Sequence, residues 1–449
     1  MSKGKKSSPL DRHPLAVQYR PASAIIPDPK NPRFHDEKQI KKIAESIRTF
    51  GFIVPVLVDA GRKIIAGHGR LEAAVLLGLK EVPTITLEHL SPEQVRAFMI
   101  ADNHLTEIGT WDNRLLGEQL RALAEAQVDF SMEVTGFETA EIDSYIEGLE
   151  EAHDGDDPAD EVPASGPAVA RSGDLWLLDK HRVLCGDSLK ADSFAKLLEG
   201  KKAAVVVTDP PFNTRVDRYI CNFGKTKFRE FEMASGEMTP QEFTGFLTKA
   251  FRNLANASVP GALHYIAIDW RHLPELLAAG KDAYTEFKAL CVWVKNSAGQ
   301  GSLYRSQHEL FAIFKSGKAP HRNNIQLGKY GRYRTNVWEY ARVNGAAGSS
   351  DEEGLGKMHP TIKPVQLVAD VLMDSTTRGD TVLDAFLGSG TTVIAAERTG
   401  RICYGLEIDP AYVDVIIRRW ETFTGKSAVH AKSKKSFREL EEVASAKKK

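Results

Sequence analysis

A stretch near the carboxyl end of the chain constrains the fold more than any other. Residues 381–409 read "TVLDAFLGSGTTVIAAERTGRICYGLEID". An apolar strand ends at Asp384, a glycine turn at Gly388 and Gly390 opens a helix, and a second strand ends at Glu407. This pattern predicts a βαβ nucleotide-binding unit, in which the glycines let the backbone approach a ligand and the second acid accepts hydrogen bonds from ribose hydroxyls.

The same turn indicates the kind of cofactor. It is not a G-x-G-x-x-G loop, and no basic residue stands at the turn to meet a pyrophosphate. A cofactor that has a nucleoside and no phosphates fits better, and S-adenosylmethionine is the common one. The alternative is a glycine turn that serves only topology.

The surrounding sequence predicts the rest of the sheet. Short apolar runs such as "AAVVVTD" (203–209), "ALHYIAID" (262–269) and "ELFAIFK" (309–315) alternate with helical segments such as "PQEFTGFLTKAFRNLANA" (240–257). Such alternation predicts an α/β fold with a Rossmann-like, doubly wound, mostly parallel sheet covered by helices on both faces.

One of these strands ends in a rigid polar cluster. Residues 208–212 read "TDPPF", and the two prolines have no amide hydrogen with which to continue a sheet ladder. The carboxylate of Asp209 and the carbonyl of Pro210 are two fixed acceptors, and Phe212 offers a flat apolar face. Two acceptors beside a stacking ring suit a planar exocyclic amine, as on adenine or cytosine. A Pro-Pro turn with a packed phenylalanine is the alternative.

Together, "DPPF" (209–212) and "DAFLGSG" (384–390) resemble the motifs of the amino-methyltransferases that modify DNA. The resemblance covers about residues 171–425. The catalytic motif precedes the cofactor motif, which is similar to the circularly permuted β-class and implies the class I methyltransferase fold. Within the family an aspartate at the first position goes mostly with adenine N6, whereas cytosine N4 enzymes favour serine.

The resemblance also implies roles for individual residues. Asp187 would contact the adenine of the cofactor, and Thr361 and Lys363 would lie near its methionine carboxylate. The residues that match catalytic positions are Asp209, Pro210, Pro211 and Phe212, and those that match cofactor positions are Asp187, Thr361, Lys363, Asp384, Phe386, Gly388, Gly390, Thr391, Thr392 and Glu407.

A basic segment lies where this family places target recognition. Between Lys318 and Arg342 six Lys or Arg residues meet one acid, Glu339. Double-stranded DNA is the expected partner, and its target base would be flipped out of the helix to reach the pocket. The candidate DNA contacts are Arg305, Arg322, Lys329, Arg332 and Arg334. A solvated loop is the alternative.

The amino-terminal part resembles a second family. "IIPDPKNPRFHDEKQIKKIAESIRTFGFIVPVLV" (25–58) and "IIAGHGRLEAAVLLGL" (64–79) are similar to the ParB and sulfiredoxin-like fold over about residues 20–110. The resemblance implies a smaller α+β domain whose loop at Gly67, His68 and Arg70 holds nucleotide phosphates, since free amides at a helix start bind anions. Gly69 departs from the family pattern, and a purely structural turn is the alternative.

Composition and linkers complete the predicted organisation. The length of 449 residues suggests roughly two or three compact units. The predicted parts are a basic tail (1–19), a ParB-like domain (20–110), a helical extension (111–150), an acidic Pro/Ala-rich linker (151–170), a methyltransferase domain (171–425, with target recognition at about 318–358) and a basic tail (426–449). The four cysteines form no C-x-x-C pair, which disfavours a metal site. Without an apolar span or a secretion signal, a cytoplasmic protein without membrane contact is expected.

These observations predict an S-adenosylmethionine-dependent DNA (adenine-N6)-methyltransferase tethered to a ParB-like module. The alternatives are a cytosine N4 enzyme, a nucleotide-gated ParB-like DNA-binding factor with a vestigial methyltransferase domain, and methylation of RNA or of a protein glutamine. The sequence also leaves a homodimer open.

Overall fold

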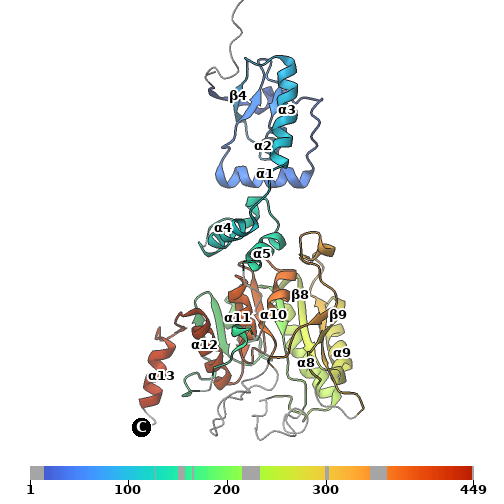
Figure 1. Ribbon diagram of the computed structural model, residues 1–449. Helices are drawn as coiled ribbons and strands as arrows, with labels where there is room; N and C mark the ends of the chain where they lie inside the picture. Colours follow the sequence, from blue (N-terminus) through green and yellow to red (C-terminus); the bar gives the residue numbers. More distant parts are fainter. Residues whose placement is uncertain are drawn as a thin grey trace, which may run out of the picture. The chain divides into compact units, whose positions relative to one another are not determined.

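The structure is a computed structural model of the chain, and it describes residues 15–126, 128–149, 157–163, 166–214, 233–298, 303–343 and 362–446. The chain divides into two compact units, Met1–Leu149 and Glu150–Lys449, called here the N-terminal unit and the C-terminal unit. Figure 1 shows both.

The first part of the N-terminal unit is a small α+β fold. A four-stranded sheet has the order β1-β4-β2-β3. The elements are β1 (Val17–Pro21), α1 (Glu37–Phe50), β2 (Val56–Val58), β3 (Ile64–Ala66), α2 (His68–Leu76), β4 (Glu81–Thr86) and α3 (Pro92–Glu107). The side chain of Asp36 caps α1 by accepting a hydrogen bond from the amide of Gln39 (2.7 Å), and Gly51 ends the helix with φ = 84°. The α+β fold predicted for this region is therefore confirmed.

The second part of the N-terminal unit is helical. It contains α4 (Asn113–Glu125), the short 3₁₀ helix η2 (Met132–Thr135) and α5 (Thr139–Glu147), with Leu120, Ile142 and Ile146 buried between α4 and α5. The two helices approach closely at Gly117, where a Cβ atom would lie 2.6 Å from the carbonyl oxygen of Tyr145. Only glycine fits there without a shift of the backbone.

The C-terminal unit is built on one large mixed sheet. Its strand order is β11-β9-β10-β8-β7-β12-β13-β6-β5-β14. The strands are β5 (Leu175–Leu178), β6 (His181–Cys185), β7 (Ala203–Thr208), β8 (Ser258–Ile268), β9 (Glu286–Val294), β10 (His308–Lys315), β11 (Val337–Glu339), β12 (Thr381–Asp384), β13 (Ile402–Glu407) and β14 (Val429–His430). The five central strands, from β8 to β6, are parallel, as predicted for a doubly wound sheet.

Helices cover both faces of this sheet. They are α6 (Ala191–Leu198), α8 (Pro240–Asn256), α9 (Leu273–Ala283), α10 (Val365–Ser375), α11 (Thr391–Arg398), α12 (Pro410–Thr424) and α13 (Phe437–Ala446). On β7, Val205 and Val207 pack with α10, α11 and α12, whereas Val206 packs on the other face with α6, α8 and α9. Figure 1 shows α8 and α9 side by side, apart from α11 and α12. Because both faces are buried, the central strands are apolar throughout rather than alternating.

Two segments that were predicted as a tail and as a linker are packed in the C-terminal unit. The predicted basic tail is wrong for residues 426–446, which form β14 and α13. Phe437 of α13 is fully buried, with its ring 5.4 Å from that of Trp176. The prediction of a tail rested on the basic composition and overlooked a capping box at the start of α13. There the hydroxyl of Ser436 accepts a hydrogen bond from the amide of Glu439, and the carboxylate of Glu439 accepts one from the amide of Ser436.

The predicted linker also makes specific contacts beyond its first residues. Asp157 forms an ion pair with Arg398 (2.6 Å), and the carboxylate of Asp160 accepts a hydrogen bond from the amide of Val365 (2.7 Å). Ala159 and Ala170 are buried in the core of the C-terminal unit. Among the described residues, no helix is both long and apolar enough to cross a membrane.

Candidate active site

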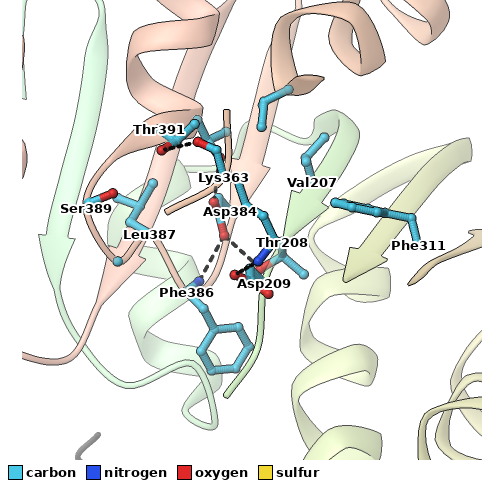
Figure 2. Close-up of a pocket in the computed structure, with 13 residues that line it drawn as sticks. Val207, Thr208, Asp209, Phe311, Lys363, Asp384, Phe386, Leu387, Ser389 and Thr391 are labelled. Carbon is cyan, nitrogen blue, oxygen red and sulfur yellow. Dashed lines mark hydrogen bonds and ion pairs between the residues drawn. The ribbon is translucent and has the colours of Figure 1, made fainter. Parts of the chain in front are cut away.

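A pocket opens at the carboxyl ends of β7 and β12. Its empty space is about 480 Å³, the open mouth included. Figure 2 shows side chains from separate parts of the chain converging on it. The lining residues are Val207, Thr208, Asp209, Phe311, Lys363, Val368, Asp384, Phe386, Leu387, Gly388, Ser389, Thr391 and Thr392. The sequence motifs around Asp209 and around Asp384 therefore meet in one place, because β7 and β12 are parallel neighbours.

Asp209 presents one engaged oxygen and one unengaged oxygen at this pocket. Its Oδ2 accepts a hydrogen bond from the ammonium group of Lys363. Its Oδ1 is buried and has no hydrogen-bond partner among the described residues. A buried acceptor without a partner costs free energy, so this oxygen is well placed to receive a donor from a ligand. The ring of Phe212 packs nearby, with its centroid 5.6 Å from the Lys363 nitrogen.

Lys363 continues into a chain of buried charges. Its ammonium group is also 3.0 Å from Oε2 of Glu309, at the start of β10, and Glu309 Oε1 accepts a hydrogen bond from Lys295, which follows β9. Burial alone would raise the pKa of Glu309, but Lys363 and Lys295 outweigh it and lower that pKa to about 2. Burial raises the pKa of Asp209, with Lys363 opposing and Glu309 adding to the rise. The Lys363 ammonium thus pairs with two protein carboxylates, and its contact with the methionine carboxylate of the cofactor stays a prediction.

Asp384 fastens the glycine turn to its surroundings. Its carboxylate accepts hydrogen bonds from Thr208 Oγ1 (2.7 Å), Thr392 Oγ1 (2.7 Å) and the amide of Phe386 (3.0 Å), as Figure 2 shows in part. Burial raises the pKa of Asp384 to about 6, although Thr392 and Thr208 hold it down. These contacts make Asp384 a structural clamp of the turn as well as a lining residue.

Glu407 closes the other side of the turn. Its Oε2 accepts a hydrogen bond from the amide of Gly388 (2.8 Å) and its Oε1 from the amide of Asp409 (2.9 Å). Burial raises the pKa of Glu407 to about 7, although these two amides oppose the shift. Gly405 lets the turn approach β13, because a Cβ atom there would lie 2.3 Å from the side chain of Leu387.

These features fit a nucleoside cofactor that has no phosphates. The turn between Asp384 and Gly390 lines an open pocket, and Glu407 contacts this turn through the amide of Gly388, with lone pairs that two backbone amides do not exhaust. Asp187 follows β6, where the amide of Gly186 donates to the backbone oxygen of Glu407 (2.9 Å), so Asp187 lies beside this edge. Glu407 and Asp187 are thus placed to hold a nucleoside, while the hydroxyls of Thr391 and Thr392 donate to protein oxygens. Thr361 lies outside the described residues.

The predicted DNA contacts do not gather at this pocket. Because β10 runs antiparallel to β8, the residues after Lys315 lie at the amino ends of the central strands, opposite Asp209. The amide of Gly261, near the start of β8, donates to Ser316, and the amide of Asn324 donates to Asp374 at the far end of α10. Arg322 and Lys329 belong to this distal segment, and Arg332 and Arg334 lie on the stretch that leads from it to β11, whose last residue, Glu339, pairs with Val294 at the pocket end. Arg305, which precedes β10, is at the pocket end.

The prediction that Arg332 and Arg334 contact DNA is also corrected by the structure. Arg332 is 7% exposed, and its guanidinium bonds both Asp370 (2.9 Å) and Asp374 (3.0 Å). Arg334 also pairs with both acids, and it donates to the hydroxyl of Tyr340 (2.6 Å). Both arginines form ion pairs with acids of α10, so their guanidinium groups are not available to bind phosphates. The sequence could not show this, because the partner acids lie on α10, far along the chain.

In the N-terminal unit, the loop predicted to hold phosphates forms the first turn of helix α2. Gly67 has φ = 103° and precedes α2, and Arg70 folds back over it, since a Cβ atom on Gly67 would lie 2.8 Å from the guanidinium. His68 is buried, and its Nε2 accepts a hydrogen bond from the amide of Asp28 (3.1 Å). Burial lowers the pKa of His68. His68 therefore makes a structural contact. Of the two residues of this loop that were predicted to offer a side chain to phosphates, Arg70 is the one that remains a candidate.

Sequence reasoning missed the charged residues behind the pocket. Neither Glu309 nor Lys295 was predicted as a site residue, and the sheet pairing of β9 with β10 brings the two together. Arg419 of α12 is also buried, and it donates to the hydroxyl of Thr391 (3.2 Å) and to the backbone oxygen of Ala159 (2.8 Å). No local pattern marks any of the three.

Models of three protein families match the chain. The model described as DNA methylase matches residues 203–418. The ParB N-terminal domain matches residues 7–103, and the ParB-methyltransferase HTH domain matches residues 114–172. The third match covers α4, η2 and α5, which were predicted only as a helical extension.

Individual relatives resemble the two units separately. A ParB-like nuclease domain-containing protein, YnaK of Escherichia coli, is 44% identical over 80 residues, which are 18% of this chain and 92% of that protein. The type II methyltransferase M.HpaI of Haemophilus parainfluenzae is 24% identical over 277 residues, 58% of this chain and 81% of that protein.

Two solved structures are each similar to part of the chain. The M1.HpyAVI–SAM complex covers 53% of this chain and 97% of its own, with 19% identity and a TM-score of 0.37. The chromosome-partitioning protein ParB from Caulobacter crescentus, complexed with CTP-gamma-S, covers 30% of this chain and 72% of its own, with 25% identity and a TM-score of 0.22. From the family matches, residues 203–418 belong to the DNA methylase family, and a ParB N-terminal domain and a ParB-methyltransferase HTH domain precede them in the chain.

Proposed function

We propose that this DNA methyltransferase modifies the N6 amine of adenine in double-stranded DNA. The observation that carries the proposal is the Oδ1 of Asp209: this residue lines the pocket, and its Oδ1 is buried without a hydrogen-bond partner among the described residues. A carboxylate is a stronger acceptor than the serine hydroxyl that is more frequent in cytosine N4 enzymes, because its hydrogen bonds are charge-assisted. The first residue of the catalytic motif therefore favours adenine.

The residues around Asp209 have distinct tasks in this reaction. Asp209 Oδ1 and the backbone oxygen of Pro210 accept hydrogen bonds from the two N–H groups of the amine, so that the nitrogen lone pair is directed away from the ring. Phe212 stacks on the flipped base, and the prolines keep both acceptors in place. S-adenosylmethionine, the cofactor of this family, supplies the methyl group. Positioning and electrostatics account for the catalysis in this proposal.

The DNA would approach from the carboxyl ends of the central strands. Several exposed residues lie at that end: Trp270 and Arg271 follow β8, and Leu303, Tyr304 and Arg305 precede β10. Trp270 is 53% exposed with the Arg271 guanidinium 5.0 Å from its ring, and Tyr304 is 85% exposed. Aromatic and basic side chains at the mouth suit a duplex from which one base is withdrawn. Arg305 remains a proposed DNA contact on this ground.

The test is the chemical identity of the product. Purified protein is incubated with unmethylated DNA and labelled S-adenosylmethionine, and the DNA is digested to nucleosides for mass spectrometry. We expect N6-methyladenine, and we expect Asp209→Ala to reduce its formation by about a hundredfold or more, since positioned acceptors act in the transition state. Formation of N4-methylcytosine would contradict the adenine assignment while leaving the family intact. The matched control is Asp192→Ala, on the surface of α6.

A further inference from the structure

The charged residues behind Asp209 form a compact group that joins four elements. Asp209 follows β7, Glu309 is the second residue of β10, Lys295 follows β9 and Lys363 precedes α10. The side chains are 24%, 8%, 17% and 8% exposed respectively. Two carboxylates thus meet two ammonium groups with little solvent to separate them, and Lys363 lies between the carboxylates.

We propose that Lys363 and Glu309 are a positioning pair that keeps Asp209 an ionised acceptor and directs its Oδ1 at the target amine, with Lys295 holding Glu309 in place. This inference rests on the proposed function only in taking an exocyclic amine as the target, so it applies equally to adenine and to cytosine. Lys363 and Glu309 touch no reacting atom in this proposal and act through Asp209.

The geometry explains why one oxygen of Asp209 stays available. Lys363 approaches Oδ2, and its position is fixed from its other side by Glu309 and from its own backbone, whose oxygen accepts a hydrogen bond from Thr391 Oγ1 (3.2 Å). A lysine without a second carboxylate could turn toward either oxygen of Asp209, because its ammonium is a compact charge on a flexible stem. Glu309 removes that freedom, and Oδ1 is left for the substrate.

The charge balance explains why Asp209 accepts rather than donates. The charged groups that face it are Lys363, Glu309, Lys295 and, through Thr208, Asp384. Without Lys363, the buried carboxylates of Asp209 and Glu309 would repel each other, and one would take up a proton near neutral pH. A protonated Asp209 would offer a hydrogen-bond donor to an amine that is itself a donor.

The first experiment measures kcat against pH for the full-length protein and for Lys363→Met. The neutral side chain has a similar length and no charge. We expect the rate at about pH 7 to fall by roughly a hundredfold, and the acidic limb of the profile to move upward, so that the loss is at least tenfold smaller at about pH 9. The KM for S-adenosylmethionine should stay within about twofold of the wild-type value.

Three further variants make the result specific. In the double variant Lys363→Met/Glu309→Gln, kcat should be about tenfold higher than in Lys363→Met alone. The acidic limb of its pH profile should move back toward that of the wild type, because one of the two like charges is removed. Lys363→Arg should retain the wild-type profile shape, because it restores the charge. Lys315→Met is the matched control: Lys315 lies at the opposite end of β10, where it pairs with Glu286 (2.9 Å), and its loss should leave the profile unchanged.

A spectroscopic measurement keeps the proposal testable whatever the enzyme methylates. Protein labelled with carbon-13 at the aspartate carboxyls is titrated by NMR, with Asp209→Asn assigning the resonance. We expect an ionised Asp209 at about pH 7 in the wild type and a protonated one in Lys363→Met. The proposal is overturned if Asp209 titrates alike in both proteins, or if Lys363→Met chiefly raises the KM for S-adenosylmethionine. Loss of the adenine product in the wild type would overturn only the proposed function.

Discussion

At the scale of single residues, the two acids of the cofactor turn have different surroundings. Asp384 accepts hydrogen bonds from three donors and clamps the turn, whereas Glu407 accepts hydrogen bonds from two backbone amides of the described residues. Burial raises the pKa of both carboxyls, to about 6 and about 7 respectively. Their protonation in the folded protein therefore changes within the range in which enzymes are usually assayed.

This leads to a prediction on the pH dependence of cofactor binding. The folded-state pKa of Glu407 is raised. The contribution of this carboxyl to folding stability is therefore fully present when the pH is below the ordinary pKa of a glutamate, and it is lost as the pH rises through about 7. The ionised carboxylate is the better acceptor for ribose hydroxyls, so the affinity for S-adenosylmethionine should rise several-fold between about pH 6 and pH 8. Calorimetric titrations over this range measure it. Glu407→Gln should abolish the rise, and Glu199→Gln, on the exposed end of α6, should preserve it.

A second prediction concerns the arginines that were expected to bind DNA. The variant Arg332→Ala removes one buried cation from both Asp370 and Asp374, and the side chain of Asp374 is only 4% exposed. We therefore expect a loss of about 3–5 kcal/mol in the free energy of unfolding. Urea unfolding of the C-terminal unit measures this loss. Lys329→Ala, in the same segment with an exposed side chain, should change stability by less than about 0.5 kcal/mol. Equal stabilities of the two variants would contradict the buried network.

At the scale of elements, the turn between β12 and α11 depends on a residue in another strand. Gly405 of β13 leaves room for Leu387, whose amide also donates to the backbone oxygen of Leu406 (3.0 Å). The turn is therefore shaped by its own glycines and by the neighbouring strand together. A sequence motif that ends at Gly390 describes only half of this arrangement.

Gly405→Ala tests that dependence. The added methyl group would overlap the Leu387 side chain, so we expect a loss of about 1–3 kcal/mol in unfolding free energy and weaker binding of S-adenosylmethionine. Thermal unfolding with and without the cofactor measures both effects. Gly245→Ala is the control, since this glycine lies on the exposed side of α8 with no atom within 4 Å of the added Cβ, and it should stabilise the protein slightly. A Gly405→Ala protein with normal affinity would contradict the close approach.

At the scale of the whole molecule, the two compact units have separate hydrophobic cores. Val56, Ile64 and Leu71 belong to a cluster within the N-terminal unit, whereas the two large clusters belong to the C-terminal unit. Residues 157–163 pack on the C-terminal unit, so the structured part of that unit begins ahead of the methylase match at residue 203. Units with separate cores need not unfold together.

We therefore expect two transitions in differential scanning calorimetry of the full-length protein. S-adenosylmethionine at about a hundred times its dissociation constant should stabilise the C-terminal unit by about 2.7 kcal/mol and leave the other transition in place. A single transition that moves as a whole on adding the cofactor would show that the units are thermodynamically coupled. Asp209→Ala, which leaves the cofactor turn intact, should show the same cofactor shift as the wild type.

The sequence by itself determined the local units of this protein. Strand β12, helix α11 and strand β13 follow from apolar periodicity and turn glycines within fewer than thirty residues, and the class of fold follows from the alternation of strands and helices. Such signals are local, because the backbone and the nearest side chains are enough to produce them. The two motifs also indicated the family, and the family matches confirmed it.

Only the tertiary structure decided which charges meet. Glu309 and Lys295 reach Lys363 because β9 and β10 are antiparallel neighbours, and the same antiparallel direction carries Arg322 and Lys329 to the end of the sheet opposite Asp209. The direction of a strand within a sheet depends on hydrogen bonds to strands distant in sequence, which no local pattern records. The free energy of a buried charge likewise depends on partners that only the complete fold supplies.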